Sequence, residues 1–300
     1  MATVAARRRL PGASWRTRAP WPVRLLKGAV IAAIFAVMLY PLLYVIMSSF
    51  MPADATLEGS VIPSSWSLEA YRVILDGGLV TRALVVSIGI TVVGTALSVL
   101  ATTTLAYGLT RTRDVPGAKT MLYLVLFTML FGAGIIPNYL LVKSLGLLNS
   151  YWSLILPGLI SAFNMVVVRN FFMQIPRDLF EAARIDGASE LRVFVRIVLP
   201  LSKAVIAVIA LFYAVGYWNS FFSAMLYIND ASKWPIQLVL NQYVLQGTPL
   251  AQLQNPNATP PPAQAVQMAV VVLATAPILV IYPFLQRYFT KGVLTGAIKG

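Results

Sequence analysis

The sequence contains no cysteine and no histidine. Disulfide bonds and thiolate nucleophiles are therefore excluded, and so are metal sites built from cysteine and histidine. A Ser-His-Asp triad is excluded for the same reason. The chain thus lacks the side chains on which most nucleophilic and metal-assisted catalysis depends.

Charge is also scarce. Charged residues make up 11% of the 300 residues and hydrophobic residues 58%, with a mean hydropathy of +0.77. A water-soluble domain is about a quarter charged and about half apolar, so lipid is the expected solvent for much of this chain. No G-x-x-x-x-G-K-[ST] loop occurs, and we expect no cofactor in this chain and no ATP bound in the P-loop manner.

Long uncharged runs are abundant. A helix needs about 20 apolar residues to cross roughly 30 Å of hydrocarbon, and lipid offers no partner to an unpaired backbone group. The sequence therefore predicts an all-α integral membrane protein with six transmembrane helices. The predicted spans cover about 28–50, 83–110, 120–142, 150–168, 204–229 and 265–286. They form one transmembrane domain, 28–300, preceded by a basic tail, 1–27.

The basic residues predict the orientation, because they are enriched in cytoplasmic loops. The tail contains several arginines and no acidic residue, and placing it inside puts most of the 23 basic residues on the cytoplasmic side. Both termini are then cytoplasmic, and the net charge of +13 needs no nucleic-acid partner. The first apolar run exceeds the roughly 7–15 residues of a cleaved signal peptide, so we expect a retained anchor.

A charged segment, 169–203, separates two of these spans and has the pattern of two short helices separated by a glycine. Glu181-Ala182-Ala183 is followed by Asp186-Gly187 and then by Leu199-Pro200. The two alanines leave a flat surface that another protein can approach. Gly187 permits the left-handed conformation that ends a helix, and Pro200 marks the junction with the fifth span.

Two interpretations of this segment stay open on the residues alone. A solvated charged loop is one, but such a loop needs no glycine-punctuated pair of helices. A docking element is the other, because side chains of mixed sign suit a protein partner better than lipid headgroups alone.

The pattern resembles a known family. Together with Leu199-Pro200-Leu201-Ser202-Lys203, Tyr217 to Phe222, and the end from Gln286 to Gly300, it resembles the permeases of binding-protein-dependent ABC sugar importers. Among these, it resembles the maltose-permease type and, within that type, the oligosaccharide group called LplC or YtcP. The resemblance covers nearly everything after about residue 65 but not the arginine-rich tail.

The resemblance implies a transport subunit that is not itself an enzyme, in the cell membrane of a prokaryote. Its expected partners are a second homologous permease subunit, two ATP-binding subunits that hold the ATP, an extracellular solute-binding protein, and membrane lipid. Segment 169–203 then becomes a coupling loop that docks in a cleft of an ATP-binding subunit. The implied coupling residues are Glu181, Ala182, Ala183, Asp186, Gly187, Leu199 and Pro200.

No Asp, Glu, Lys or Arg lies deep in any predicted span. Charges at that depth normally mark ion or proton pathways, so a neutral solute is expected. Sugars are held by hydrogen bonds and ring stacking, which amide and aromatic side chains supply. The candidates for the path are Asn138, Asn164, Tyr213, Tyr217, Trp218 and Asn219. Ordinary hydrogen bonding between helices is the alternative for each of them.

Two other functions are alternatives to the importer. A six-span secondary carrier or channel for a neutral solute would need ligands for a coupling ion or paired broken helices, and neither is clear in the sequence. An intramembrane enzyme would need histidine, cysteine or acidic residues at depth, and none is there.

Overall fold

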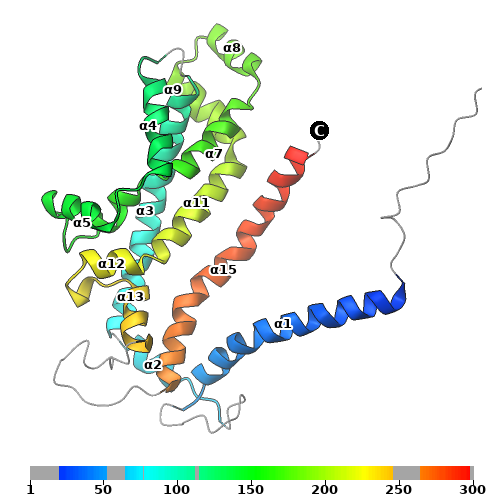
Figure 1. Ribbon diagram of the computed structural model, residues 1–300, viewed down its shortest axis with the longest axis vertical. Helices are drawn as coiled ribbons and strands as arrows, with labels where there is room; N and C mark the ends of the chain where they lie inside the picture. Colours follow the sequence, from blue (N-terminus) through cyan, green and yellow to red (C-terminus); the bar gives the residue numbers. More distant parts are fainter. Residues whose placement is uncertain (1–19, 53–64, 77, 112–114, 246–263, 298–300) are drawn as a thin grey trace, which may run out of the picture.

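The computed structural model describes residues 20–52, 65–76, 78–111, 115–245 and 264–297 (Figure 1). Within these ranges the chain consists of helices joined by turns, and none of the described residues lies in a β-strand. The longer helices are α1 (Trp21–Ser49), α3 (Leu79–Thr110), α4 (Ala118–Leu130), α7 (Ala162–Met173), α11 (Lys203–Trp218) and α15 (Gln264–Ala297).

Short helices connect these long ones. They are α2 (Glu69–Leu75), α5 (Ile135–Ser144), α6 (Trp152–Ile155), η2 (Leu156–Gly158), α8 (Arg177–Ile185), α9 (Glu190–Val193), η3 (Phe194–Val198), α10 (Leu199–Leu201), α12 (Phe221–Tyr227), η4 (Ala231–Lys233), α13 (Ile236–Leu240) and η5 (Asn241–Leu245). Helices α2 and α13 lie at one end of the molecule, and α8 and α9 lie at the other (Figure 1).

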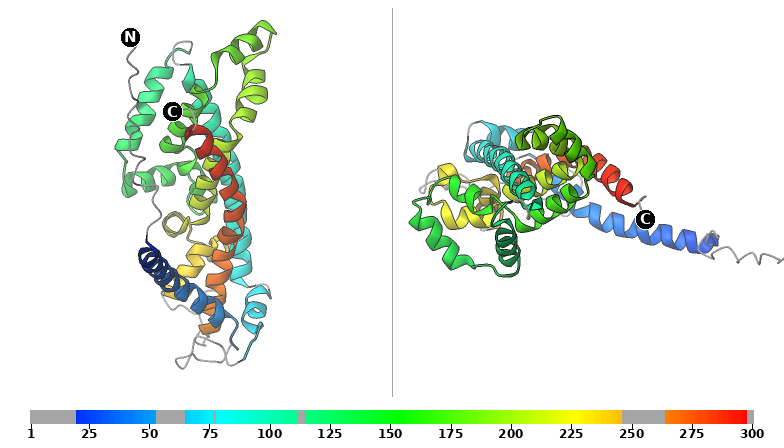
Figure 2. Two further views of the ribbon diagram at one scale, coloured as in Figure 1. Left: turned by 90° about the vertical axis from the view of Figure 1, so that its right-hand side faces the viewer. Right: turned by 90° about the horizontal axis from the view of Figure 1, so that it is seen from above.

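Helix α3 is the central element. It runs antiparallel to α11, and α7 packs beside it (Figure 2). Its buried face repeats at helical spacing and consists largely of small residues, which let neighbouring backbones approach closely and donate short hydrogen bonds. The buried residues on this face include Ser87, Ile90, Gly94, Ser98, Thr102 and Ala106.

Two clusters of buried side chains hold the helices together. The larger joins α3, α7 and α11 and extends to α8, α9 and α12. The smaller joins α2, α13 and the first part of α15, and it includes Trp218.

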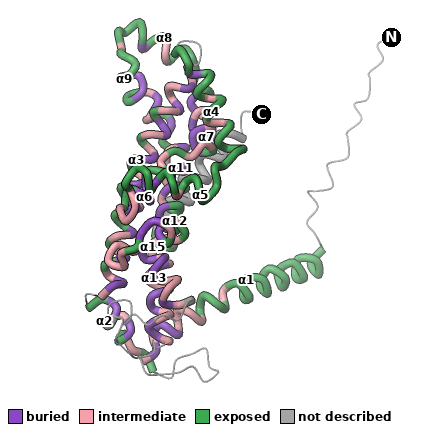
Figure 3. The backbone as a smooth tube through the Cα atoms, turned by 60° about the vertical axis from the view of Figure 1, so that its left-hand side comes forward, coloured by how far each residue is buried: buried purple, intermediate pink, exposed green. Residues whose placement is uncertain are grey.

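Helix α1 stands apart from the rest. Only its C-terminal end packs against the molecule, where it meets α15. Most of its residues are exposed, as Figure 3 shows. The predicted first span, 28–50, falls almost entirely on this helix.

Within the described residues, α1 and α3 are long and apolar enough to cross a membrane, and there are up to four such spans if each of two bent helix pairs counts as one. Shorter apolar helices, 118–130 and 264–280, lie in two further predicted spans. The count of six spans therefore stays a prediction.

Three of the predicted spans are divided in the structure. Span 120–142 breaks between α4 and α5, where Gly134 has φ of +84°. Span 150–168 is bent by 49° before α7, and span 204–229 is interrupted between α11 and α12. A hydrophobic run indicates which segment is removed from water, but it does not indicate where a helix within that segment ends.

Candidate functional site

The first candidate site is a helical hairpin at one end of the molecule, which we call the elbow (residues 176–201). Its first limb is α8, and it ends as the sequence predicts: Gly187 has φ of +70°. The amide of Ala188 donates to the carbonyl of Ala183 (2.9 Å), and the amide of Gly187 donates to that of Arg184 (3.0 Å). This pair of bonds is a Schellman motif, which satisfies carbonyls at the end of the helix.

The second limb of the elbow is α9, η3 and α10, and it leads into α11. The axis bends by 82° between residues 190–201 and α11. The sequence predicts the junction at Pro200, whereas the helix continues through Leu201 and the break falls at Ser202, which is fully buried. Proline tolerates a position in the first turn of a helix, so Pro200 lies in the first turn of α10 and does not end the limb.

The predicted coupling residues differ in exposure. Glu181, Ala182, Asp186 and Gly187 are exposed, as is Pro200, and Leu199 is half-buried. Ala183 is buried in the larger cluster, so it serves the packing beneath the elbow and not its outer surface.

The two most exposed aliphatic side chains on the elbow were not singled out from the sequence. Ile185 is 86% exposed and Leu191 is 71% exposed. Both lie near Gly187, at the turn between the limbs. Large apolar groups at such a tip are a usual feature of a surface that another protein covers.

The inner face of the elbow is tied to the end of α3 by a cluster of polar and aromatic side chains. The Tyr107 hydroxyl donates to Glu190 Oε2 (2.8 Å), and Arg111 Nη1 donates to Glu190 Oε1 (2.8 Å). Phe194 packs against the Tyr107 ring with centroids 4.9 Å apart. The sequence reasoning missed these residues, because about 80 positions separate α3 from α9 and no local motif connects them.

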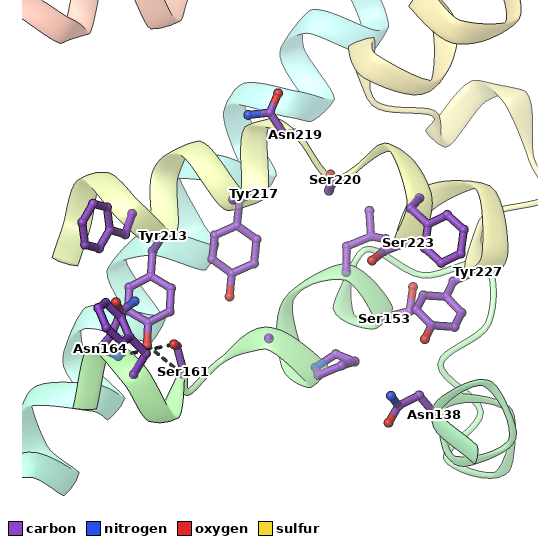
Figure 4. A pocket seen from close by; sticks show the side chains of 17 residues that line it. Asn138, Ser153, Ser161, Asn164, Tyr213, Tyr217, Asn219, Ser220, Ser223 and Tyr227 are labelled. Atoms are coloured by element: carbon purple, nitrogen blue, oxygen red, sulfur yellow. Dashed lines mark hydrogen bonds between the residues drawn. The ribbon is translucent and has the colours of Figure 1, made fainter. Parts of the chain in front are cut away.

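The second candidate site is a cavity of about 710 Å³, and Figure 4 shows the side chains that line it. Helices α5, α6, α7, α11 and α12 contribute to it. Its lining residues are Asn138, Ser153, Leu154, Pro157, Gly158, Ser161, Phe163, Asn164, Phe212, Tyr213, Gly216, Tyr217, Asn219, Ser220, Phe222, Ser223 and Tyr227. None of the lining residues carries a charge at neutral pH, and most of the polar ones are hydroxyls or amides.

Two tyrosines on α11 form the wall between this cavity and α3. The Tyr213 hydroxyl lies 2.6 Å from Thr102 Oγ1, and the Tyr217 hydroxyl lies 2.7 Å from Ser98 Oγ. Tyr217 also donates to the carbonyl of Ile155 (3.2 Å), and Tyr213 accepts from the Ser161 amide (2.9 Å). The phenol groups are therefore fixed by three different helical segments.

Five of the six residues predicted for the path line this one cavity: Asn138, Asn164, Tyr213, Tyr217 and Asn219. Trp218 is absent from the lining: its indole Nε1 donates to the carbonyl of Ala274 on α15 (2.9 Å), within the smaller cluster. The cavity is also lined by Ser153, Ser161, Ser223 and Tyr227, which the sequence reasoning did not single out.

The chemistry of the cavity is that of hydrogen bonding and stacking. Hydroxyl and amide groups donate and accept, while phenol rings offer flat apolar faces. In the part of the chain that the structure describes, no group of three or more acidic, histidine or cysteine side chains could hold a metal ion.

An all-helical bundle with membrane-length apolar helices, a large uncharged cavity and an exposed elbow at one end has the features of a membrane permease. The chain belongs to the family of binding-protein-dependent transport system inner membrane components, whose profile matches residues 28–295.

Two relatives match this chain over most of their length. The chain is 50% identical over 271 residues to the protein LplC of Bacillus subtilis (strain 168), covering 88% of this chain and 90% of the relative. It is 47% identical over 264 residues to the polygalacturonan/rhamnogalacturonan transport system permease protein YtcP of the same organism, covering 87% and 92%.

A solved structure is similar as well. It is a crystal structure of a bacterial ABC transporter involved in the import of the acidic polysaccharide alginate. The TM-score is 0.82 at 28% sequence identity, and the match covers 91% of this chain and 98% of that chain.

Proposed function

We propose that this chain is a permease subunit of an ATP-driven ABC importer. It forms half of the transmembrane pathway for a carbohydrate, specifically an oligosaccharide. It crosses the membrane six times with both termini in the cytoplasm. The observation that carries the proposal is the elbow: a hairpin closed by a left-handed glycine, whose exposed residues stand at one end of the bundle.

The exposed surface of the elbow supports docking against a protein. Charged Glu181 and Asp186 lie near the aliphatic Ile185 and Leu191. A solvated loop would gain nothing from exposing two large aliphatic groups, whereas a cleft in an ATP-binding subunit would remove them from water. The elbow is therefore our candidate for the contact through which ATP-driven closure moves the permease.

The cavity supports a carbohydrate as the solute. Its hydroxyl, amide and phenol groups match the hydrogen-bonding and stacking surfaces of a sugar ring. The names of the relatives agree with a carbohydrate, since they describe transport of polygalacturonan, rhamnogalacturonan and the acidic polysaccharide alginate. Acidic polymers differ, however, from the neutral solute that the uncharged spans predict. Membership of a binding-protein-dependent family also favours the importer over a self-sufficient six-span carrier or channel.

The proposed assembly has partners on both sides of the membrane. A second, homologous permease completes the pathway, two ATP-binding subunits supply the energy, and an extracellular solute-binding protein delivers the sugar. This chain then needs no cofactor of its own, because ATP is held by the partner subunits. Lipid surrounds the helices, and no nucleic acid takes part.

The test is Gly187→Leu in the reconstituted complex. A residue with a side chain pays about 1–3 kcal/mol for the left-handed conformation, so the elbow should lose its shape. We expect ATP-dependent uptake of labelled oligosaccharide to fall to background while the subunit still inserts in the membrane.

The matched control is Gly187→Asn, because asparagine tolerates the left-handed region. Nothing lies within 4 Å of a Cβ built at this glycine, so the two variants differ in backbone preference and not in local crowding. Uptake should be largely retained in Gly187→Asn. Normal uptake by Gly187→Leu, or uptake by this chain without ATP-binding subunits, would overturn the proposal.

A further inference from the structure

Among the described residues, Glu190 is the one elbow carboxylate that forms an ion pair. It accepts from the Tyr107 hydroxyl and from Arg111 Nη1, each at 2.8 Å, and Arg111 Nη2 donates to the Tyr107 hydroxyl at 2.9 Å. The three side chains thus form a closed ring of hydrogen bonds. Arg184 adds a longer contact to the same carboxylate, at 3.5 Å.

Aromatic contacts attach both limbs of the elbow to the same arginine and tyrosine. The Arg111 guanidinium lies 5.7 Å from the ring centroid of Phe180 on α8. Phe194, on the second limb, packs on the Tyr107 ring. Arg111 and Tyr107 stand at the end of α3, so neither limb can move far without moving that end or breaking these contacts.

The same helix leads to the cavity. Farther along α3, Thr102 lies 2.6 Å from the Tyr213 hydroxyl and Ser98 lies 2.7 Å from the Tyr217 hydroxyl. Both tyrosines line the cavity. A rigid helix therefore connects the cluster at the elbow with the phenol groups that face the solute.

We propose that Glu190, Arg111 and Tyr107 form a positioning cluster that makes the elbow and α3 move as one body, so that a displacement of the elbow reaches the cavity tyrosines. This role rests on the proposed function of the elbow as the contact with the ATP-binding subunit. It assigns the cluster to transmission and not to docking, because two of its three side chains, Arg111 and Tyr107, belong to the end of α3 and bind Glu190 of the elbow.

Stability of the fold is a poor explanation for this cluster. The Glu190 side chain is 56% exposed and that of Arg111 is 15% exposed, and ion pairs with one partner in solvent contribute little to stability. Variants of Glu190 should therefore insert and assemble, which leaves transport as the property that changes.

The experiment measures ATP hydrolysed per solute imported in the reconstituted four-subunit complex, with Glu190→Ala and Tyr107→Phe. Tyr107→Phe removes only the hydroxyl and keeps the ring beneath Phe194. In both variants hydrolysis should continue while uptake falls, raising this ratio about 2- to 30-fold, the range expected for side chains that contribute to coupling. The double variant Glu190→Arg with Arg111→Glu restores the ion pair in reverse and should lower the ratio toward that of the wild type.

The charge control is Lys119→Gln, which removes a basic group from the neighbouring α4, where its contact is with the Tyr123 ring. Its ratio should equal that of the wild type. An unchanged ratio in Glu190→Ala and Tyr107→Phe overturns the inference, as does a parallel loss of uptake and hydrolysis, which would indicate docking. If the wild-type complex itself shows no ATP-dependent uptake, the proposed function is wrong. The wild-type measurement therefore distinguishes an error in the proposed function from an error in the role of the cluster alone.

Discussion

At the scale of single residues, the contact between α3 and α11 depends on Gly94. A Cβ built there would lie 2.8 Å from the Tyr217 ring, closer than real side chains approach one another. The ring has little room to retreat, because its hydroxyl is hydrogen-bonded to Ser98 and to the carbonyl of Ile155. The absence of a side chain at this position thus allows the tyrosine ring to approach α3 closely.

We therefore expect Gly94→Ala to lower the thermal stability of the purified subunit and to reduce uptake. Extra volume in a well-packed interior typically costs about 1–3 kcal/mol. The matched control is Gly89→Ala, on the same helix, where nothing lies within 4 Å of the added carbon. Equal melting temperatures for the two variants would contradict the close approach of Tyr217.

The residue types of the cavity could be anticipated from the sequence, but their grouping could not. Asn138 and Tyr213 attract notice as polar or aromatic residues in apolar runs, and both line the cavity. Trp218 follows Tyr217 directly, yet successive residues on a helix point about 100° apart, and its indole donates to α15. Only the packing of α11 between two neighbours decides which of the two lines the cavity.

At the scale of elements, the turns at the end opposite the elbow are held together by Asn149 and Asp230. Asp230 Oδ1 accepts from the Ser232 amide (2.9 Å) at the start of η4, and the Asp230 amide donates to Asn149 Oδ1 (3.1 Å). The hydrogen bonds from Ser232 hold the pKa of the Asp230 carboxyl below its usual value of 3.8, with smaller contributions from Lys233 and Arg82.

A lowered pKa predicts how this turn responds to acid. The bonded carboxylate stabilises η4 fully at pH values above 3.8, and the contribution is lost as the pH falls through the lower pKa of the folded state. Hydrogen exchange at the Ser232 amide, corrected for its intrinsic rate, should show constant protection at neutral pH and decreasing protection on acidification. Asp230→Asn should be less protected at neutral pH and lack the acid step; the same acid profile in both proteins would refute the assignment.

The elbow shows which structural features a local sequence pattern can predict and which it cannot. The end of α8 was predictable because the left-handed turn is a property of Gly187 and its immediate neighbours. The break between α4 and α5 was not, because Gly132 and Gly134 lie in a continuous apolar run and tertiary packing decides whether such glycines end a helix. The attachment of Glu190 to Arg111 was not predictable either, since it depends on how α3 and α9 meet in space.

At the scale of the whole molecule, the proposed coupling requires that the two ends of the bundle face different compartments. Helix α3 has 32 residues, and at 1.5 Å per residue it is roughly 48 Å long, well beyond the roughly 30 Å of a hydrocarbon core. Helix α2 adjoins its beginning, and the elbow adjoins its end (Figure 1). If α3 crosses the membrane, these two regions must lie on opposite sides of it.

The absence of cysteine makes this arrangement directly measurable. Ser65 and Ser189 are both exposed, lie at opposite ends of α3, and differ from cysteine by one atom. A membrane-impermeant maleimide should label Ser65→Cys in intact cells and Ser189→Cys only in inside-out vesicles. Ser189 makes no side-chain capping bond, so its replacement should leave α9 in place.

Co-expression of the ATP-binding subunits extends the measurement to docking. A partner seated on the elbow should slow labelling of Ser189→Cys and leave labelling of Ser65→Cys unchanged, because only the first lies at the proposed contact. Labelling of both cysteines from the same side would show that α3 does not cross the membrane. Labelling of the elbow from outside would place it beyond the reach of any intracellular ATPase, and the coupling role would then have no physical basis.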